Sequence, residues 1–214
     1  MPDMLLIFPP VAKASEPPAG IARLAAALRA HALPCRLLDA NLEGQLWLLE
    51  QTPTVSDTWS RRAYKGLADN LAALRDARTY HTPDRYRRAV SDLNRLLAVS
   101  SLQYAASVGL SDYQQTSLSP LCSADLIEAA EKPQLNPFYP YFSRRLPELL
   151  DGVGMVGFSL NYLSQALTTF AMIGFIRENF PDRKILLGGG LITSWMQRPG
   201  WRSPFVSRTV GALR

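Results

Sequence analysis

Three short clusters of polar residues and glycines could hold a ligand. They are Asp39-Ala-Asn41-Leu-Glu-Gly44, Ser159-Leu160-Asn161 and Gly188-Gly189-Gly190. A serine hydroxyl can donate a hydrogen bond to an acceptor that would otherwise lose its solvation on burial. Glycines remove side chains where a bulky planar group approaches the backbone. Taken together, these residue types favour a cofactor-binding site.

Each cluster follows a short apolar run of the kind that forms a buried strand. We expect strands over 4–8, 35–39, 155–159 and 184–187, and helices over 21–30 and 165–179. Two strand–helix–strand units on one chain predict the α/β class, as an open, doubly wound parallel sheet of the Rossmann or flavodoxin type. Ligands bind such sheets outside the carboxyl ends of the strands, where these clusters lie.

A long segment without the strand–helix–strand pattern separates the two units. Residues 45–150 are too many for an ordinary α/β connection, and their leucines recur at helical spacing. We therefore expect one α/β domain, formed by 1–44 and 151–214, with 45–150 as a helical insertion. Because a doubly wound sheet usually continues with a further strand, we also expect this domain to be truncated at its C-terminus.

The clusters resemble the pattern of cobalamin-binding domains, Asp-x-His-x-x-Gly followed by Ser-x-Leu and Gly-Gly. Asn41 stands where that family has its cobalt-ligating histidine, and the leucine after Ser159 is displaced by one position, to Leu160. Pro17-Pro18-Ala19-Gly20 after the first strand is similar to the N-terminal domain of cobalamin-dependent radical S-adenosylmethionine proteins, in which the histidine is often absent. The resemblance covers 4–44 and 155–193.

The resemblance implies a cobalamin-binding module without a catalytic residue of its own. It implies cofactor-binding roles for Pro18, Gly20, Asp39, Asn41, Gly44, Ser159, Leu160, Asn161, Gly188, Gly189 and Gly190. Ser159 would bind the lone nitrogen of the cofactor's benzimidazole, and Gly44 would allow a tight turn below the corrin ring. It also implies a downstream radical core that carries S-adenosylmethionine and a [4Fe-4S] cluster, because these residues hold no Cys-x-x-x-Cys-x-x-Cys motif.

Asn41 is the informative departure from the family. Neutral imidazole is a good ligand for transition metals, whereas an amide offers only a weak oxygen. We therefore expect no metal ligand from the protein, with Asn41 facing cobalt weakly at most. A cobalt ion with a weak or aqueous lower ligand is suited to methyl transfer, so a methyltransferase is the expected whole enzyme.

Other interpretations remain open. Gly188–Gly190 could serve a flavodoxin-like nucleotide- or phosphate-binding domain, and the helical insertion could make the chain a regulatory protein-interaction module. Asp39 could simply cap a helix beginning near Leu42. The aromatic segment 138–142 could pack in the core or form a lid over the corrin, and His31 lies at the end of a helix.

Composition limits the classes of partner. The chain has 23 basic and 18 acidic residues, a net charge of +5 and no long run of like charges, so we expect no nucleic-acid partner. Cys35 and Cys122 lie far apart, which favours a reducing, cytoplasmic location. The longest apolar stretch, 166–176, is too short for a membrane span, so we expect a soluble protein without a membrane partner.

Overall fold

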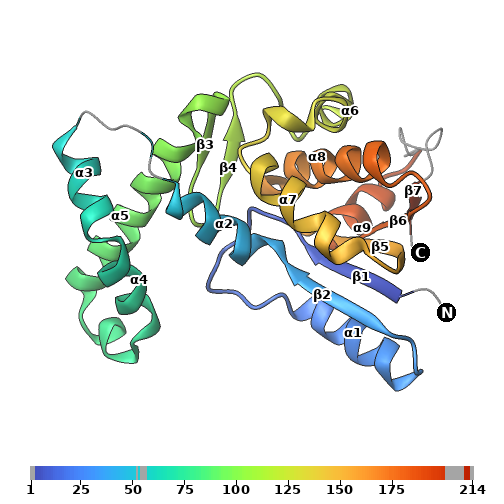
Figure 1. The fold of residues 1–214 in the computed structure, drawn as a ribbon, viewed down its shortest axis with the longest axis horizontal. Helices are drawn as coiled ribbons and strands as arrows, with labels where there is room; N and C mark the ends of the chain where they lie inside the picture. Colours follow the sequence, from blue (N-terminus) through green and yellow to red (C-terminus); the bar gives the residue numbers. More distant parts are fainter. Residues whose placement is uncertain (1–2, 52, 54–56, 201–209, 213–214) are drawn as a thin grey trace.

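The computed structural model describes residues 3–51, 53, 57–200 and 210–212, and an open parallel sheet forms its centre. The strand order is β2-β1-β5-β6-β7, and every neighbouring pair is parallel (Figure 1). The strands are β1 (Asp3–Phe8), β2 (Cys35–Asp39), β5 (Val153–Ser159), β6 (Lys184–Gly188) and β7 (Val210–Ala212). The predicted α/β class with an open parallel sheet is confirmed.

Strand β1 is buried on both faces, as its continuous apolar run predicts. Leu5 and Ile7 belong to the main hydrophobic core, whereas Leu6 and Phe8 pack in a second cluster with α1 (Ala19–Ala30). Successive side chains of a strand point to opposite faces, so helices cover both faces of the sheet. On the main-core side lies α8 (Leu163–Asn179), whose residues 165–176 are all buried.

The strand order reverses between β1 and β5. The chain leaves β1 through α1 to reach β2 on one side, whereas β5, β6 and β7 follow one another on the other side. The loops that leave β1 and β5 therefore diverge at the carboxyl edge of the sheet. This reversal creates the crevice in which open α/β sheets bind ligands.

Residues 45–150 contain helices, as expected, and also a hairpin that the sequence pattern did not reveal. The hairpin pairs β3 with β4 antiparallel, and each strand has three residues, too few for alternation to be recognised. Helix α2 (Ala40–Glu50) begins before this segment and runs into it. The elements after it are α3 (Thr58–Lys65), α4 (Leu67–Arg75), η1 (Ala77–His81), α5 (Pro83–Ser101), η2 (Leu102–Tyr104), β3 (Ala106–Val108), β4 (Tyr113–Gln115), α6 (Ser123–Glu131), η3 (Pro133–Leu135) and α7 (Tyr139–Leu150).

The second half of this segment packs directly on the sheet. Phe142, Leu146 and Leu150 of α7 are fully buried in the same core as Val156 of β5 and Phe175 of α8. The aromatic segment 138–142 therefore lies mainly in the core, which confirms the packing interpretation over the lid. The sheet and the second half of 45–150 form one continuous apolar interior.

The first half of the segment projects from the rest of the molecule. Helices α3, α4 and α5, with η1 between the last two, form a lobe beyond α2 (Figure 1). We call residues 58–101 the arm. Leu93, Leu96 and Leu97 of α5 connect the arm to the main core. Helix α9 (Gly190–Met196) follows β6, and its Ile192 belongs to the main core.

Candidate functional site

A cavity of about 270 Å³ lies at the point where the strand order reverses. The loop after β1, the first turn of α1 and the loop after β5 supply its walls. The lining residues are Phe8, Ala12, Glu16, Pro17, Pro18, Ala19, Gly20, Ser159, Asn161 and Tyr162. Four predicted ligand-binding residues, Pro18, Gly20, Ser159 and Asn161, therefore meet in one cavity.

Gly20 and Ser159 are neighbours in the lining of this cavity. A methyl group placed on Gly20 would lie 3.8 Å from Ser159 Oγ. Helix α1 begins here after Pro18, without a side-chain cap and without an acidic residue in its first turn. The wall around Gly20 therefore presents bare backbone to the space in front of Ser159.

The amide of Asn161 determines which hydrogen bond Ser159 can make. Gly190 N–H donates to Asn161 Oδ1 at 2.9 Å, which fixes the orientation of the amide. Asn161 Nδ2 then donates to Ser159 Oγ at 3.0 Å. Since Ser159 is the acceptor in this bond and its hydroxyl has no other partner within the described ranges, its O–H is available as a donor to a ligand in the cavity.

The glycine cluster is bound to the loop after β5. Leu160 N–H donates to Gly188 O at 2.7 Å, and Leu191 N–H donates to Leu160 O at 3.2 Å. Gly189 has a φ of +111°, and a side chain there would overlap the Leu160 backbone, so only glycine suits this position. A side chain on Gly188 would meet nothing within 4 Å. Leu160 itself is fully buried and lies outside the cavity lining.

The loop after β1 is anchored on one side by the start of α8. Gln165 Nε2 donates to Pro9 O at 2.7 Å, and Ser164 Oγ donates to Val11 O at 2.8 Å. Gln165 Oε1 in turn accepts from the backbone N–H groups of Asn161 and Tyr162. One fully buried side chain, that of Gln165, therefore connects the two loops that line the cavity.

The same loop is anchored on its other side by α2. Ala12 N–H donates to Asn41 Oδ1 at 2.8 Å, and Gln45 Nε2 donates both to Asn41 Oδ1 and to Ala12 O. Asn41 is only 2% exposed and does not line the cavity. The side chain of Asn41 is therefore buried and supports a cavity-lining loop, and its expected weak approach to cobalt stays a prediction.

Asp39 and Gly44 also serve α2 rather than the cavity. Asp39 Oδ1 accepts from Leu42 N–H at 2.9 Å and caps the helix, which confirms that interpretation. Burial raises the pKa of the Asp39 carboxyl, although the Leu42 hydrogen bond opposes the shift. Gly44 lies inside α2 against Phe138 and Tyr141. The expected tight turn at Gly44 is therefore wrong, because the helix continues through it.

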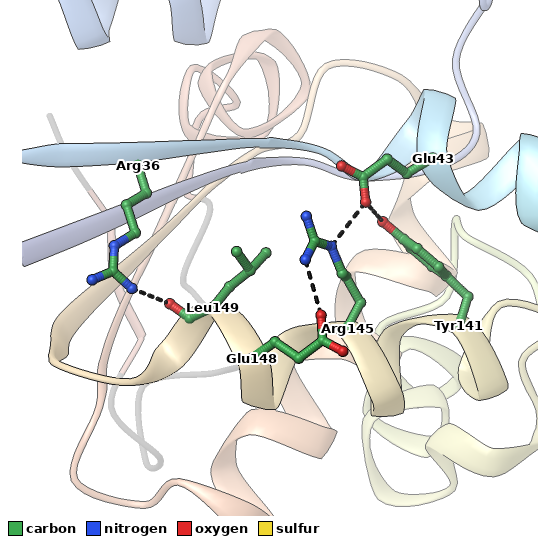
Figure 2. A network of polar contacts seen from close by, with 6 residues as sticks. All are labelled: Arg36, Glu43, Tyr141, Arg145, Glu148 and Leu149. Carbon is green, nitrogen blue, oxygen red and sulfur yellow. Dashed lines mark hydrogen bonds and ion pairs between the residues drawn. The ribbon is translucent and has the colours of Figure 1, made fainter.

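Figure 2 shows what holds α2 and β2 against α7. Glu43 Oε2 accepts from Tyr141 Oη at 3.1 Å and from Arg145 Nε at 3.0 Å, and Arg145 Nη1 lies 3.0 Å from Glu148 Oε2. Arg36 of β2 donates to Leu149 O at 3.0 Å. Burial, together with Glu43, raises the pKa of Tyr141. These contacts fix the helix that carries Asn41, so the network supports the loop behind the cavity.

Glu16, Tyr162 and Gln165 are site residues that the sequence pattern did not single out. Tyr162 Oη donates to Glu16 Oε2 at 3.4 Å across the rim, and Lys13 Nζ pairs with Glu16 at 3.3 Å. Glu16 directly precedes the segment Pro17–Gly20, and Tyr162 directly follows the cluster Ser159–Asn161. Gln165 is a polar residue at the start of an otherwise apolar helical run, and that contrast was the available signal.

Neither histidine approaches the cavity. His31 follows α1 at the end opposite to Gly20, and His81 closes η1 in the arm. Across the described ranges, no group of three or more His, Cys, Asp and Glu side chains gathers as a metal site would require. In the same ranges, no helix combines the length and the apolarity needed to cross a bilayer.

Comparisons of this chain with models of protein families, with curated proteins and with solved structures found no match.

Proposed function

We propose that this chain is a cobalamin-binding module that holds the cofactor at the strand-reversal cavity without a histidine ligand to cobalt. The observation that carries the proposal is the free donor of Ser159, which faces bare backbone at Gly20. A buried aromatic nitrogen needs such a donor, because burial without a hydrogen bond costs about 1–3 kcal/mol. The family resemblance of the surrounding residues supplies the identity of the ligand.

The residues present fit the nucleotide arm of cobalamin. Pro17 and Pro18 offer an apolar wall for a flat benzimidazole, and Gly20 leaves its approach clear. Ser159 would donate to the free ring nitrogen, while Asn161 and Gly190 hold that hydroxyl in place. The cavity of about 270 Å³ would hold one end of the cofactor, and the remainder would lie along the carboxyl edge towards Gly188.

Bound cobalamin would supply a cobalt centre able to carry a methyl group. The protein's part in the proposal is binding and orientation. None of the described residues lining the cavity is a histidine, which supports a site without a protein imidazole on the metal. Asn41 contributes from behind by fixing the loop at Ala12.

The module would serve a larger enzyme. In the proposal, a radical S-adenosylmethionine core of the same protein carries the [4Fe-4S] cluster and S-adenosylmethionine and performs the methylation. The two cysteines of this chain are both free, and the proposed location is the reducing cytoplasm.

A flavin or another phosphate-bearing nucleotide is the second candidate, because sheets with this strand order bind flavin at the same reversal point. Glu16 argues against it. The Glu16 carboxylate lies at the rim of the cavity next to the first turn of α1. There it would repel the doubly charged terminal phosphate of flavin mononucleotide more strongly than the singly charged phosphodiester in the nucleotide arm of cobalamin. Amide groups, which cobalamin carries around its ring, can donate to a carboxylate.

Titration of the 214-residue chain with hydroxocobalamin tests the proposal. We expect retention of cobalamin through gel filtration and a visible spectrum that reports displacement of benzimidazole from cobalt. After reduction to cobalt(II), the electron paramagnetic resonance spectrum should lack nitrogen splitting from a protein imidazole. Free cobalamin, or saturable binding of flavin mononucleotide in its place, would overturn the proposal.

A matched pair of variants locates the ligand. Gly20→Leu places a side chain in front of Ser159 and should weaken cobalamin binding at least about tenfold, about 1.4 kcal/mol. Ala22→Leu adds the same side chain to an exposed position of the same helix and should leave affinity unchanged. Equal affinity of the two variants would place the cofactor elsewhere.

A further inference from the structure

The arm carries the entire net charge of the protein. Residues 58–101 contain nine Arg and Lys and four Asp, which gives +5, and the whole chain is also +5. The other residues therefore sum to zero. Asp57, which pairs with Arg95 at the start of the arm, lowers the local charge to +4. An excess gathered on one projecting lobe creates a local positive field that attracts an anionic partner.

A groove of about 600 Å³ lies between α3 and α5 on this arm. Its lining combines an exposed tryptophan with three arginines, together with polar side chains. The residues are Thr58, Trp59, Arg62, Arg87, Arg88, Ser91 and Asp92. None of them lines the strand-reversal cavity, so the groove is a separate site.

Trp59 is held in place although it is 58% exposed. Arg95 lies over its ring, with the guanidinium carbon 5.6 Å from the ring centroid. Arg95 is itself fixed by Asp57 at 3.1 Å and by Ser60 Oγ at 3.0 Å. The hydrogen bond from Ser60 N–H, with further help from Arg95, lowers the pKa of Asp57 to about 2, so this carboxylate stays charged. An exposed aromatic ring held rigid in this way is a typical anchor in protein interfaces.

The arginines of the groove are available to a partner. Arg62 and Arg88 are exposed and have no partner among the residues that the structure describes. Arg87 has only a loose contact of 3.6 Å with the exposed Asp84. Asp92 is already engaged by Asn70 at 3.1 Å. The groove therefore offers cationic donors beside a flat apolar surface.

We propose that this groove binds an acidic segment of a partner polypeptide that also carries an apolar side chain. The apolar side chain would lie on Trp59, and carboxylates would pair with Arg62, Arg87 and Arg88. The mixed lining favours a peptide over a nucleic acid, because the groove and its surroundings also hold aspartates that would repel a continuous row of phosphates.

Fluorescence anisotropy with short labelled peptides tests this proposal on the whole chain. A peptide of glutamates and aspartates with two leucines should bind, and binding should weaken with added salt. Its glutamine and asparagine analogue, and an acidic peptide without leucine, should each bind at least about tenfold less tightly. Equal binding of all three peptides, or of none, would overturn the proposal. So would tighter binding of oligothymidylate than of the acidic peptide.

Charge-reversal variants assign the binding to the groove. Arg62→Glu with Arg88→Glu should weaken the acidic peptide at least about tenfold. Arg23→Glu with Arg144→Glu changes the same charge at exposed positions outside the arm and should change affinity less than about twofold. Circular dichroism of all variants checks that they fold. If both pairs weaken binding equally, the attraction is one of overall charge and the groove is not the site.

Discussion

Asn161 decides what Ser159 can offer to a ligand. Its amide carbonyl is occupied by Gly190, so its NH₂ group must face Ser159, and the serine proton is left for the cavity. An aspartate at this position could still accept from Gly190. It would also accept the serine proton, because a carboxylate has no donor of its own.

Asn161→Asp should therefore weaken cobalamin binding as much as Ser159→Ala does, about tenfold or about 1.4 kcal/mol. The shape of the side chain is retained, so the urea midpoint should change little. Spectral titration of the two variants beside the unmodified chain measures the effect. Undiminished binding by Asn161→Asp would show that the Ser159 proton is not used.

Gly189 and Gly188 are neighbours with opposite tolerance for a side chain. Gly189→Ala should lower the free energy of unfolding by about 2–4 kcal/mol, because a positive φ and the Leu160 backbone both oppose a methyl group. A methyl group at Gly188 would meet open space, so Gly188→Ala should change the free energy of unfolding by no more than about 0.5 kcal/mol. Urea unfolding of both variants checks this contrast. Equal destabilisation would contradict it.

Pro18, Gly20, Ser159 and Asn161, which sequence reasoning singled out, line one cavity. The burial of Asn41 within a helix was not foreseen. Asn41 lies in the first turn of α2, where helical phase turns its side chain inwards to Ala12. Spacing along a motif does not specify that phase.

At the scale of elements, the strands and the helices next to them were predicted closely. The expected helix over 165–179 and strand over 155–159 correspond to α8 and β5. Long apolar periods are strong signals because burial imposes them. The hairpin β3–β4 was missed, since two strands of three residues leave no period to detect. A further strand after β6, whose absence was the reason to expect a truncated domain, is present as β7. The truncation itself stays a prediction.

Gln165 joins two elements that no local pattern connects. Gln165→Glu keeps an acceptor for the N–H groups of Asn161 and Tyr162 but loses the donor to Pro9 O. We expect a loss of about 2–3 kcal/mol in unfolding free energy and weaker cobalamin binding, because a buried charge would face a carbonyl oxygen. Ser164→Ala, which removes the neighbouring bond to Val11, is the control and should cost about 1 kcal/mol. A Gln165→Glu variant no less stable than Ser164→Ala would refute the connecting role.

At the scale of the molecule, the sheet and α7 share their interior. Leu146 is fully buried in α7 within the core that includes β5. Leu146→Ala should therefore destabilise the whole protein by about 2–5 kcal/mol. Far-ultraviolet circular dichroism and tryptophan fluorescence should report coincident urea transitions. Two separated transitions would show that 45–150 unfolds independently of the sheet.

The positive charge of the molecule is concentrated on the arm. The sequence gives the totals directly, but only the fold shows that the positive excess lies on one projecting lobe. The net charge of the whole chain therefore did not point to the groove on the arm. The charge of a particular surface, rather than the net charge of the chain, determines which partners that surface attracts.

The loop behind the cavity is bonded on one flank to Gln165 and Ser164 and on the other to Asn41 and Gln45. By contrast, the rim is spanned by one long contact between the exposed side chains of Tyr162 and Glu16. We therefore expect ligand exchange to be controlled by the contact between Tyr162 and Glu16 at the rim, and not by movement of the loop after β1. Tyr162→Phe should therefore raise the association and dissociation rate constants of the ligand together. The equilibrium constant should be nearly unchanged.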